Sequence, residues 1–195
     1  MIFKYSFLNL VYLIYCKFRG FFLFNNSRLI RFPIDIRGKK YIQIKKGFTT
    51  GKYCRIEVYL KNKVPILIFG ENFEMNDNVH ITAMEKVQIG NNVLIASKVY
   101  ISDCTHGSYL GNEDDSNPLM PPNSREFSTK PVFIDDNVWI GEFVSILPGS
   151  KIGKGSIIGA NSVVTKEIPP FVIAVGSPAK PIKKFNFDTE RWEKI

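Results

Sequence analysis

Two histidines, His80 and His106, are the side chains of this sequence best suited to acid–base chemistry near neutral pH. An imidazole titrates between about pH 5 and 8, so it can take a proton from a hydroxyl group and return one. His106 stands directly before the polar segment 107–130, which contains an acidic run at Glu113–Asp115 and three prolines. A loop of this length inside a compact domain is usually functional or disordered. From the residues alone, His106 is either a general base at the mouth of this loop or a structural histidine, and His80 is interpreted as a surface or groove-lining residue.

A six-residue repeat must position these side chains. Within residues 133–169 an apolar residue recurs at every sixth position, with glycines between the apolar positions. These positions are Ile134, Ile140, Ile146, Ile152, Ile158 and Val164. An amphipathic helix repeats about every 3.6 residues, so this period instead predicts a short extended segment and a corner, repeated around a coil. The pattern spans residues 44–168, with an edge loop at Lys61–Pro65, a slip of two residues between Ile81 and Ile89, and the long interruption after His106.

The composition excludes several other classes of protein. An apolar content of 45% in 195 residues is enough for one domain with a sizeable core. Three widely spaced cysteines without a Cys-x-x-Cys pair argue against a disulfide framework and fit a reducing, cytoplasmic compartment. The net charge of +8 favours an anionic ligand, but no nucleic-acid-binding motif accompanies it, so we predict no nucleic-acid partner. Two histidines are too few for a three-histidine zinc site, and we predict no metal.

The two ends of the chain differ from the repeat. Residues 1–40 are aromatic, apolar and basic, and an apolar residue recurs at helical spacing. The spaced residues are Phe3, Phe7, Val11, Ile14 and Phe18. The uninterrupted apolar run is far shorter than the ~20 residues of a spanning helix. The predicted helix either packs on the end of the coil or on a partner subunit, or lies in a membrane interface with Lys4, Lys17 and Arg19 toward anionic head groups. Asp188, a candidate N-cap, predicts a short helix over residues 186–195.

Longer motifs resemble a known family. Residues 131–141 read PVFIDDNVWIG, residues 158–170 read IGANSVVTKEIPP, and residues 175–182 read VGSPAKPI. Together with the repeat, they resemble the hexapeptide-repeat acyltransferases over residues 72–185. The nearest groups are the maltose, galactoside and Nod-factor O-acetyltransferases. The segment VYISDCTHGSY at residues 99–109 resembles more narrowly the enzymes that O-acetylate bacterial surface polysaccharides such as O-antigen or capsule.

The resemblance implies an all-β fold, a left-handed parallel β-helix of hexapeptide repeats. We expect it to carry an N-terminal helical segment (1–40), an acyltransferase domain (41–185) with a long protruding loop (107–130), and a C-terminal tail helix (186–195). It also implies a homotrimer, because the family binds coenzyme A in a groove between neighbouring subunits. The expected location is the cytoplasm, with peripheral association at the inner face of the membrane through the N-terminal helix.

On the acceptor side, His106 matches the catalytic histidine of the family. It would act as the general base that activates a sugar hydroxyl for direct attack on the thioester. Asn76 matches an asparagine that bonds the acceptor sugar, and its other interpretation is a corner asparagine that satisfies a turn. Asp103 either orients the imidazole or bonds the acceptor, or is a turn aspartate. Cys104 lies close by but within the repeat, so a covalent Cys–His route is not favoured.

On the donor side, the resemblance assigns seven residues to the binding of acetyl-CoA. They are Trp139, Gly141, Ala160, Thr165, Lys166, Lys180 and Lys183. The two lysines nearest the C-terminus stand where relatives often carry arginine near the nucleotide, and a lysine lacks the bidentate fork of arginine. Glu142 departs from the serine found in some sugar acetyltransferases, so it is left out of the predicted catalytic set.

The resemblance therefore implies an acetyl-CoA-dependent O-acetyltransferase that acts on a sugar hydroxyl of a bacterial surface polysaccharide or its precursor. A streptogramin-type antibiotic acetyltransferase shares the coil, the histidine and the long loop, and it is the main alternative. A non-catalytic solenoid scaffold would need neither His106 at a loop mouth nor the donor-side motifs. The aromatic N-terminus favours a membrane-associated glycan over a soluble drug.

Overall fold

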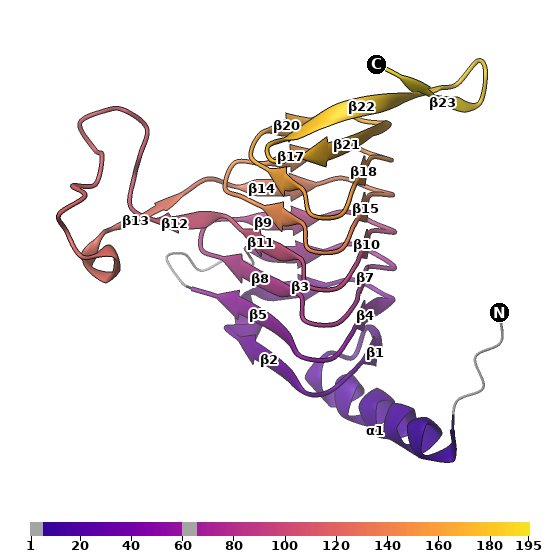
Figure 1. Cartoon of the computed structure of the whole chain (residues 1–195). Coiled ribbons are helices and arrows are strands. Elements are labelled where there is room, and N and C mark those ends of the chain that lie inside the picture. The colour runs from indigo at the N-terminus through magenta and orange to yellow at the C-terminus, as the bar shows by residue number, and fades with distance from the viewer. Residues whose placement is uncertain (1–5, 60–65) are drawn as a thin grey trace.

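The computed structural model describes residues 6–59 and 66–195 and shows a coil of short parallel strands (Figure 1). The chain passes through three sheets in turn, here called sheets A, B and C, so that each turn of the coil adds one strand to each sheet. Helix α1 (Phe7–Leu23) lies at one end of the coil, a β-hairpin lies at the other, and a long loop projects to the side (Figure 1). The predicted repeat is confirmed as a mostly β, coiled structure.

Sheet A has nine strands in the described ranges, of which the first seven are parallel. They are β1 (Ser27–Ile30), β4 (Phe48–Thr50), β7 (Glu74–Met75), β10 (Leu94–Ile95), β15 (Trp139–Ile140), β18 (Ile157–Ile158), β21 (Val172–Gly176), β22 (Ala179–Asn186) and β23 (Arg191–Lys194). Sheet B consists of β2 (Ile34–Arg37), β5 (Cys54–Val58), β8 (His80–Ala83), β11 (Tyr100–Ser102), β16 (Ser145–Ile146) and β19 (Val163–Val164). Sheet C consists of β3 (Ile42–Ile44), β6 (Leu67–Phe69), β9 (Val87–Ile89), β14 (Val132–Ile134), β17 (Lys151–Ile152) and β20 (Glu167–Ile168). The remaining elements are β12 (Cys104–His106), β13 (Phe127–Thr129) and the 3₁₀ turns η1 (Lys39–Tyr41) and η2 (Pro122–Ser124).

The core of the coil consists mostly of aliphatic side chains behind the three sheets, with Phe48, Phe69 and Phe73 packed together in its early turns. In sheet A, for example, Ile95 pairs in parallel register with Met75 on one side and Ile140 on the other. All six apolar positions predicted from the repeat in residues 133–169 are buried. Each strand is only a few residues long, so the apolar area buried between successive turns supplies most of the stability of the coil.

The coil begins earlier than the sequence analysis predicts. β1 and β2 already belong to sheets A and B, where Ile30 pairs with Thr50 and Ile36 pairs with Ile56. The predicted start near residue 44 and the predicted boundary at residue 40 are therefore wrong. Ile30 and Ile36 are six residues apart like the later repeats, but the aromatic and basic composition around them hides this spacing.

The predicted N-terminal helix is confirmed as α1. The Ser6 side chain caps its first turn by accepting a hydrogen bond from the Asn9 backbone. Gly20 lets the helix approach β1, because a Cβ at this position would lie 3.2 Å from the Ile30 Cβ. No helix in residues 6–59 or 66–195 is long and apolar enough to cross a membrane. Phe3 and Lys4 of the predicted helix, and the predicted edge loop Lys61–Pro65 further along the chain, lie outside the described residues.

The predicted C-terminal helix over residues 186–195 is wrong. β22 runs antiparallel to β21, and β23 pairs with β22, so the chain ends the coil with a hairpin (Figure 1). The rings of Phe185 and Trp192 pack edge to face across this hairpin, with centroids 5.3 Å apart. An exposed strand edge on sheet A offers unpaired backbone groups, and pairing with them outweighs the local helical signal at Asp188.

Candidate active site

His106 lies on a hairpin that leaves the coil at one corner. β12 and β13 pair antiparallel, with Cys104 opposite Thr129 and His106 opposite Phe127. The hairpin is inserted between β11 of sheet B and β14 of sheet C, and it carries the long loop away from the coil (Figure 1). We call the corners between sheets B and C the B–C edge, and those between sheets A and B the A–B edge. The histidine is thus outside the stack of strands.

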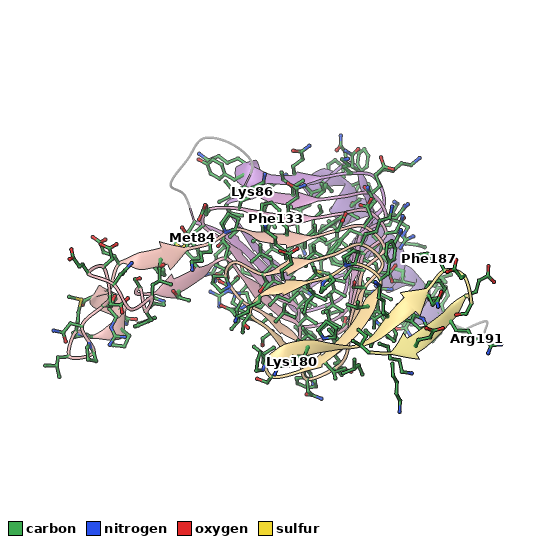
Figure 2. All side chains as sticks on the ribbon, turned by 90° about the horizontal axis from the view of Figure 1, so that it is seen from above. Met84, Lys86, Phe133, Lys180, Phe187 and Arg191 are labelled. Carbon is green, nitrogen blue, oxygen red and sulfur yellow. The ribbon has the colours of Figure 1, made fainter. Side chains whose placement is uncertain are left out.

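Asp103 anchors the base of this hairpin. Its carboxylate is fully buried and accepts hydrogen bonds from the backbone N–H groups of Met84, Glu85 and Lys86 at 2.7–3.1 Å. Figure 2 places Met84 where the hairpin joins the coil. Burial raises the pKa of the Asp103 carboxyl, and the backbone hydrogen bonds partly offset this rise. These hydrogen bonds hold the turn at residues 84–86 and none of them reaches His106, which is the arrangement expected of a turn aspartate.

The imidazole of His106 is exposed and free to meet a substrate. Its ring packs against Phe127, with centroids 4.5 Å apart, and it makes no side-chain hydrogen bond within the described part of the chain. Its backbone carbonyl accepts a hydrogen bond from the Tyr109 hydroxyl at 2.5 Å. The sequence analysis named neither Tyr109 nor Phe127, because their contacts depend on how the loop folds back on the hairpin.

Cys104 is poorly suited to act as a nucleophile. Burial raises the pKa of its thiol, and the Ser102 hydroxyl lies 3.4 Å from the sulfur. The thiolate is the reactive form of cysteine, so a raised pKa lowers the reactive fraction at neutral pH. This property agrees with a route in which no acyl-cysteine forms.

The A–B edge carries Asn76 of the predicted acceptor residues and Gly141 and Ala160 of the predicted donor residues, and the turn after β10 lies between the turn of Asn76 and that of Gly141. Asn76 follows β7, Gly141 follows β15 and Ala160 follows β18, while the half-exposed Trp139 lies on sheet A just before this edge. A Cβ on Gly141 would lie 2.6 Å from the Ala160 backbone nitrogen, so only glycine fits between the turns here. The Asn76 side chain is exposed, and its backbone N–H donates to the Ile95 carbonyl. At Gly141 and Ala160 this edge therefore presents backbone and small side chains.

The other predicted donor residues lie elsewhere. Thr165 and Lys166 follow β19 and are exposed on the B–C edge, two turns beyond the turn that bears the His106 hairpin. Lys180 and Lys183 lie on β22, beside the last turn of sheet A, and Figure 2 shows Lys180 on that strand. A single chain thus places Asn76, Gly141 and Ala160 on one edge and Thr165, Lys166 and the His106 hairpin on the other, with the width of sheet B between them.

Sheet B itself carries a charged cluster that the sequence analysis did not find. Glu57, whose side chain is only 3% exposed, forms ion pairs with Arg37 and Arg55 and lies 3.3 Å from the His80 ring nitrogen. Burial raises the pKa of Glu57, but the hydrogen bonds from Arg55 and His80 and the nearby arginine charges outweigh it and hold the pKa below its ordinary value. These residues come from three neighbouring strands, so only the register of the coil brings them together.

Three comparisons bear on this architecture. Residues 131–166 match the family model described as bacterial transferase hexapeptide (six repeats). The chain is 43% identical to the putative lipopolysaccharide biosynthesis O-acetyl transferase WbbJ of Escherichia coli over 88% of this chain and 86% of that protein. It is also 43% identical to the galactoside O-acetyltransferase of Escherichia coli, over 84% of this chain and 74% of the relative. Among solved structures, it resembles the hexapeptide-repeat-containing acetyltransferase VCA0836 of Vibrio cholerae in complex with acetyl coenzyme A. That similarity has a TM-score of 0.52 and 25% identity, and covers 83% of this chain and 72% of the other.

Proposed function

The chain belongs to the hexapeptide-repeat acetyltransferases, which use acetyl-CoA as acyl donor, and we propose that it acetylates a sugar hydroxyl of a bacterial surface polysaccharide or its precursor. The observation that carries this proposal is the 43% identity, over 88% of the chain, to a putative O-acetyl transferase of lipopolysaccharide biosynthesis. The likeness to a galactoside O-acetyltransferase supports a carbohydrate acceptor independently. By the same family relation, we infer that the coil is left-handed.

His106 is the proposed general base. Its exposed ring would take the proton of the acceptor hydroxyl, whose oxygen would attack the thioester carbonyl. The imidazolium would then return the proton to the departing thiolate, so the proton balance closes without an acyl-enzyme. The place of the ring, on a hairpin beyond the coil and against Phe127, supports this role. Asn76 is proposed to bond the acceptor.

The donor would bind along the A–B edge. The space around Gly141 and Ala160 suits close approach of a slender pantetheine arm, because a larger residue at Gly141 would collide with the next turn. Trp139 is half-exposed beside these residues, and Thr165 would contact the donor from the B–C edge of a neighbouring copy. The exposed cations Lys166 and Lys180, with Lys183, would face the phosphates, which the net charge of +8 also favours.

We propose a homotrimer because the site residues lie on two edges of one chain. If the A–B edge of one copy docks beside the B–C edge of the next, Asn76 and Gly141 of the first copy approach His106 of the second. Threefold closure of this head-to-tail contact would then turn sheet B, with its Glu57 cluster, toward the symmetry axis. The two edges thus form a complete site only between copies.

Mixing two inactive variants tests the shared site. His106→Ala and Asn76→Ala chains, each inactive alone, should regain about a quarter of wild-type activity after unfolding and refolding together, because random mixing leaves about one site in four intact. Each variant refolded alone is the control. A mixture that stays inactive although the chains exchange would contradict a site built from two copies.

We further propose that α1 binds a membrane surface and brings the enzyme to a lipid-linked acceptor. Phe7, Ile14 and Phe18 are 65–79% exposed, and Cys16 and Gly20 on the opposite side of the helix are buried. The expected result is co-sedimentation with anionic vesicles that Phe18→Glu abolishes and the matched change Phe187→Glu, at the other end of the coil, does not. Binding by Phe18→Glu at the wild-type level would refute this proposal. If Phe18→Glu changed the oligomeric state and left vesicle binding unchanged, another copy of the chain would be the partner that covers the helix.

An acceptor screen tests the main proposal. Purified protein and labelled acetyl-CoA would be offered lipid-linked glycans, soluble glycans and a streptogramin. We expect label only in the glycans, at oxygen. Transfer only to the streptogramin would establish the rival function, and transfer to none of them by a folded protein that binds coenzyme A would contradict a glycan acceptor.

A further inference from the structure

The loop beyond the His106 hairpin is tied to the histidine itself. The Tyr109 hydroxyl donates to the His106 carbonyl oxygen at 2.5 Å, and the Arg125 guanidinium donates to the same hydroxyl at 2.7 Å. We propose that Tyr109 and Arg125 are positioning residues that fix His106 for proton transfer. This inference rests on the proposed function of His106 as the general base.

Arg125 is well placed to fix the tyrosine. Besides its bond to Tyr109, its guanidinium donates to the Met120 carbonyl at 3.0 Å and to the Pro118 carbonyl at 3.2 Å. A planar guanidinium presents its donors in a fixed fork, so three acceptors on one fork define a single arrangement of the loop. Hydrogen bonds that meet at Arg125 and the Tyr109 hydroxyl therefore hold this part of the loop.

Gly107 permits this closure. It has a φ of +105°, and a Cβ placed on it would lie 2.6 Å from the Tyr109 hydroxyl oxygen and 2.6 Å from the Ser116 hydroxyl oxygen. The chain can therefore turn directly after His106 and bring Tyr109 back only because residue 107 has no side chain. The Gly107 N–H donates to the Glu126 carbonyl, which joins the two arms of the hairpin at this point.

The β12–β13 pairing holds the backbone of His106, but few other contacts restrain its ring. Its ring packs on Phe127, which is itself 41% exposed, and no side-chain hydrogen bond orients the imidazole within the described ranges. A small displacement of a catalytic group can cost a large factor in rate, about 100-fold for 1 Å. The Arg125–Tyr109–His106 chain of hydrogen bonds ends on the backbone carbonyl of His106, so it adds to the strand pairing in fixing the backbone that carries the ring.

Three substitutions test the proposal in the full-length enzyme. Tyr109→Phe removes only the hydroxyl, Arg125→Lys keeps the charge but loses the fork, and Gly107→Ala displaces the tyrosine. We expect kcat to fall about 10-fold in each, with the KM values for acetyl-CoA and acceptor unchanged within about 2-fold. Tyr41→Phe, in the first turn of the coil, is the matched control and should keep wild-type kinetics.

A spectroscopic readout separates positioning from loss of structure. The chain has two histidines, so the imidazole NMR signal of His106 can be assigned by its absence in His106→Ala. Tyr109→Phe should shift or broaden that signal and leave the His80 signal unchanged. Wild-type kcat and an unshifted signal in both Tyr109→Phe and Arg125→Lys would overturn the inference, as would a rise in KM without a fall in kcat. Full activity of His106→Ala would instead refute the proposed function, whatever the other variants do.

Discussion

The coil and the β12–β13 hairpin are stabilised by different means. The interior of the coil is a stack of apolar side chains, and residues such as Ile101 and Ile140 are completely buried. The hairpin has three residue pairs, its side chains are exposed or only partly buried, and hydrogen bonds to backbone atoms hold its loop. The proposed base is on the second of these regions. Substitutions of the buried side chains in the coil should therefore change stability, and substitutions in the hairpin should change activity.

The largest effect should come from His106→Ala. Removal of a general base lowers kcat by about 10²- to 10⁴-fold, and the exposed ring contributes little to folding. Acetyl transfer and thermal unfolding would be measured on the same preparation. His80→Ala, the only other histidine substitution, is the control and should retain most of the activity. A fall in melting temperature as large as that of a core variant would contradict the separation of the two regions.

Ile140→Ala should have the opposite profile. This side chain is fully buried between neighbouring turns, so its truncation should lower the free energy of unfolding by about 2–5 kcal/mol. Well below the unfolding transition, kcat should stay near the wild-type value. Chemical denaturation gives the first quantity and steady-state kinetics the second. Ile182→Ala, at a half-exposed position, provides the comparison and should lose far less stability.

Asp103→Asn should affect both properties, because Asp103 joins the two regions. Asparagine keeps one acceptor oxygen but loses the charge that receives the N–H groups of residues 84–86. We expect a loss of about 1–3 kcal/mol in stability and a fall in kcat smaller than that of His106→Ala. Chemical denaturation would measure the loss of stability, and steady-state kinetics on the same preparation would measure the fall in kcat. A change in only one of the two would mean that the base of the hairpin does not couple to the coil.

The smallest effect should come from Cys104. Because burial raises the pKa of its thiol, less thiolate is present at any given pH, and alkylation should be slow at neutral pH and accelerate only above the ordinary range of a thiol. Mass spectrometry of iodoacetamide-treated protein across pH would follow this, with Cys104→Ser as the blank. Cys104→Ser should also keep its activity, and complete loss would revive an acyl-cysteine route.

The coil could be predicted from the sequence because an apolar residue recurs at every sixth position, and this pattern can be read without knowing any tertiary contact. Inward-facing positions such as Ile146 and Ile152 carry apolar residues and are buried. The first turn was missed at Ile30 and Ile36, where the same spacing lies within an aromatic segment. The C-terminal hairpin was missed because the strand edge that recruits β22 belongs to β21, and a local helix signal does not report a tertiary partner.

The site was only partly predictable. The place of His106 before a long loop is visible in the sequence, but the inward direction of Asp103 is not. Its partners at residues 84–86 fall in the two-residue slip between Ile81 and Ile89, one turn of the coil earlier. The two additional residues are visible in the sequence. The sequence does not show that the backbone turn they form directs its N–H groups to a buried carboxylate. The sequence likewise does not show that the predicted residues lie on two different edges, because this depends on which sheet each strand joins.

The reversal of the chain after β21 has a consequence for self-assembly. A stack of parallel turns has no inherent last turn, and an open strand edge can template another molecule. On sheet A, β22 occupies that edge in the opposite direction, and β23 then presents the charged side chains of Arg191, Glu193 and Lys194. A second coil cannot continue the parallel order there. The hairpin thus opposes the end-to-end addition of another coil through sheet A.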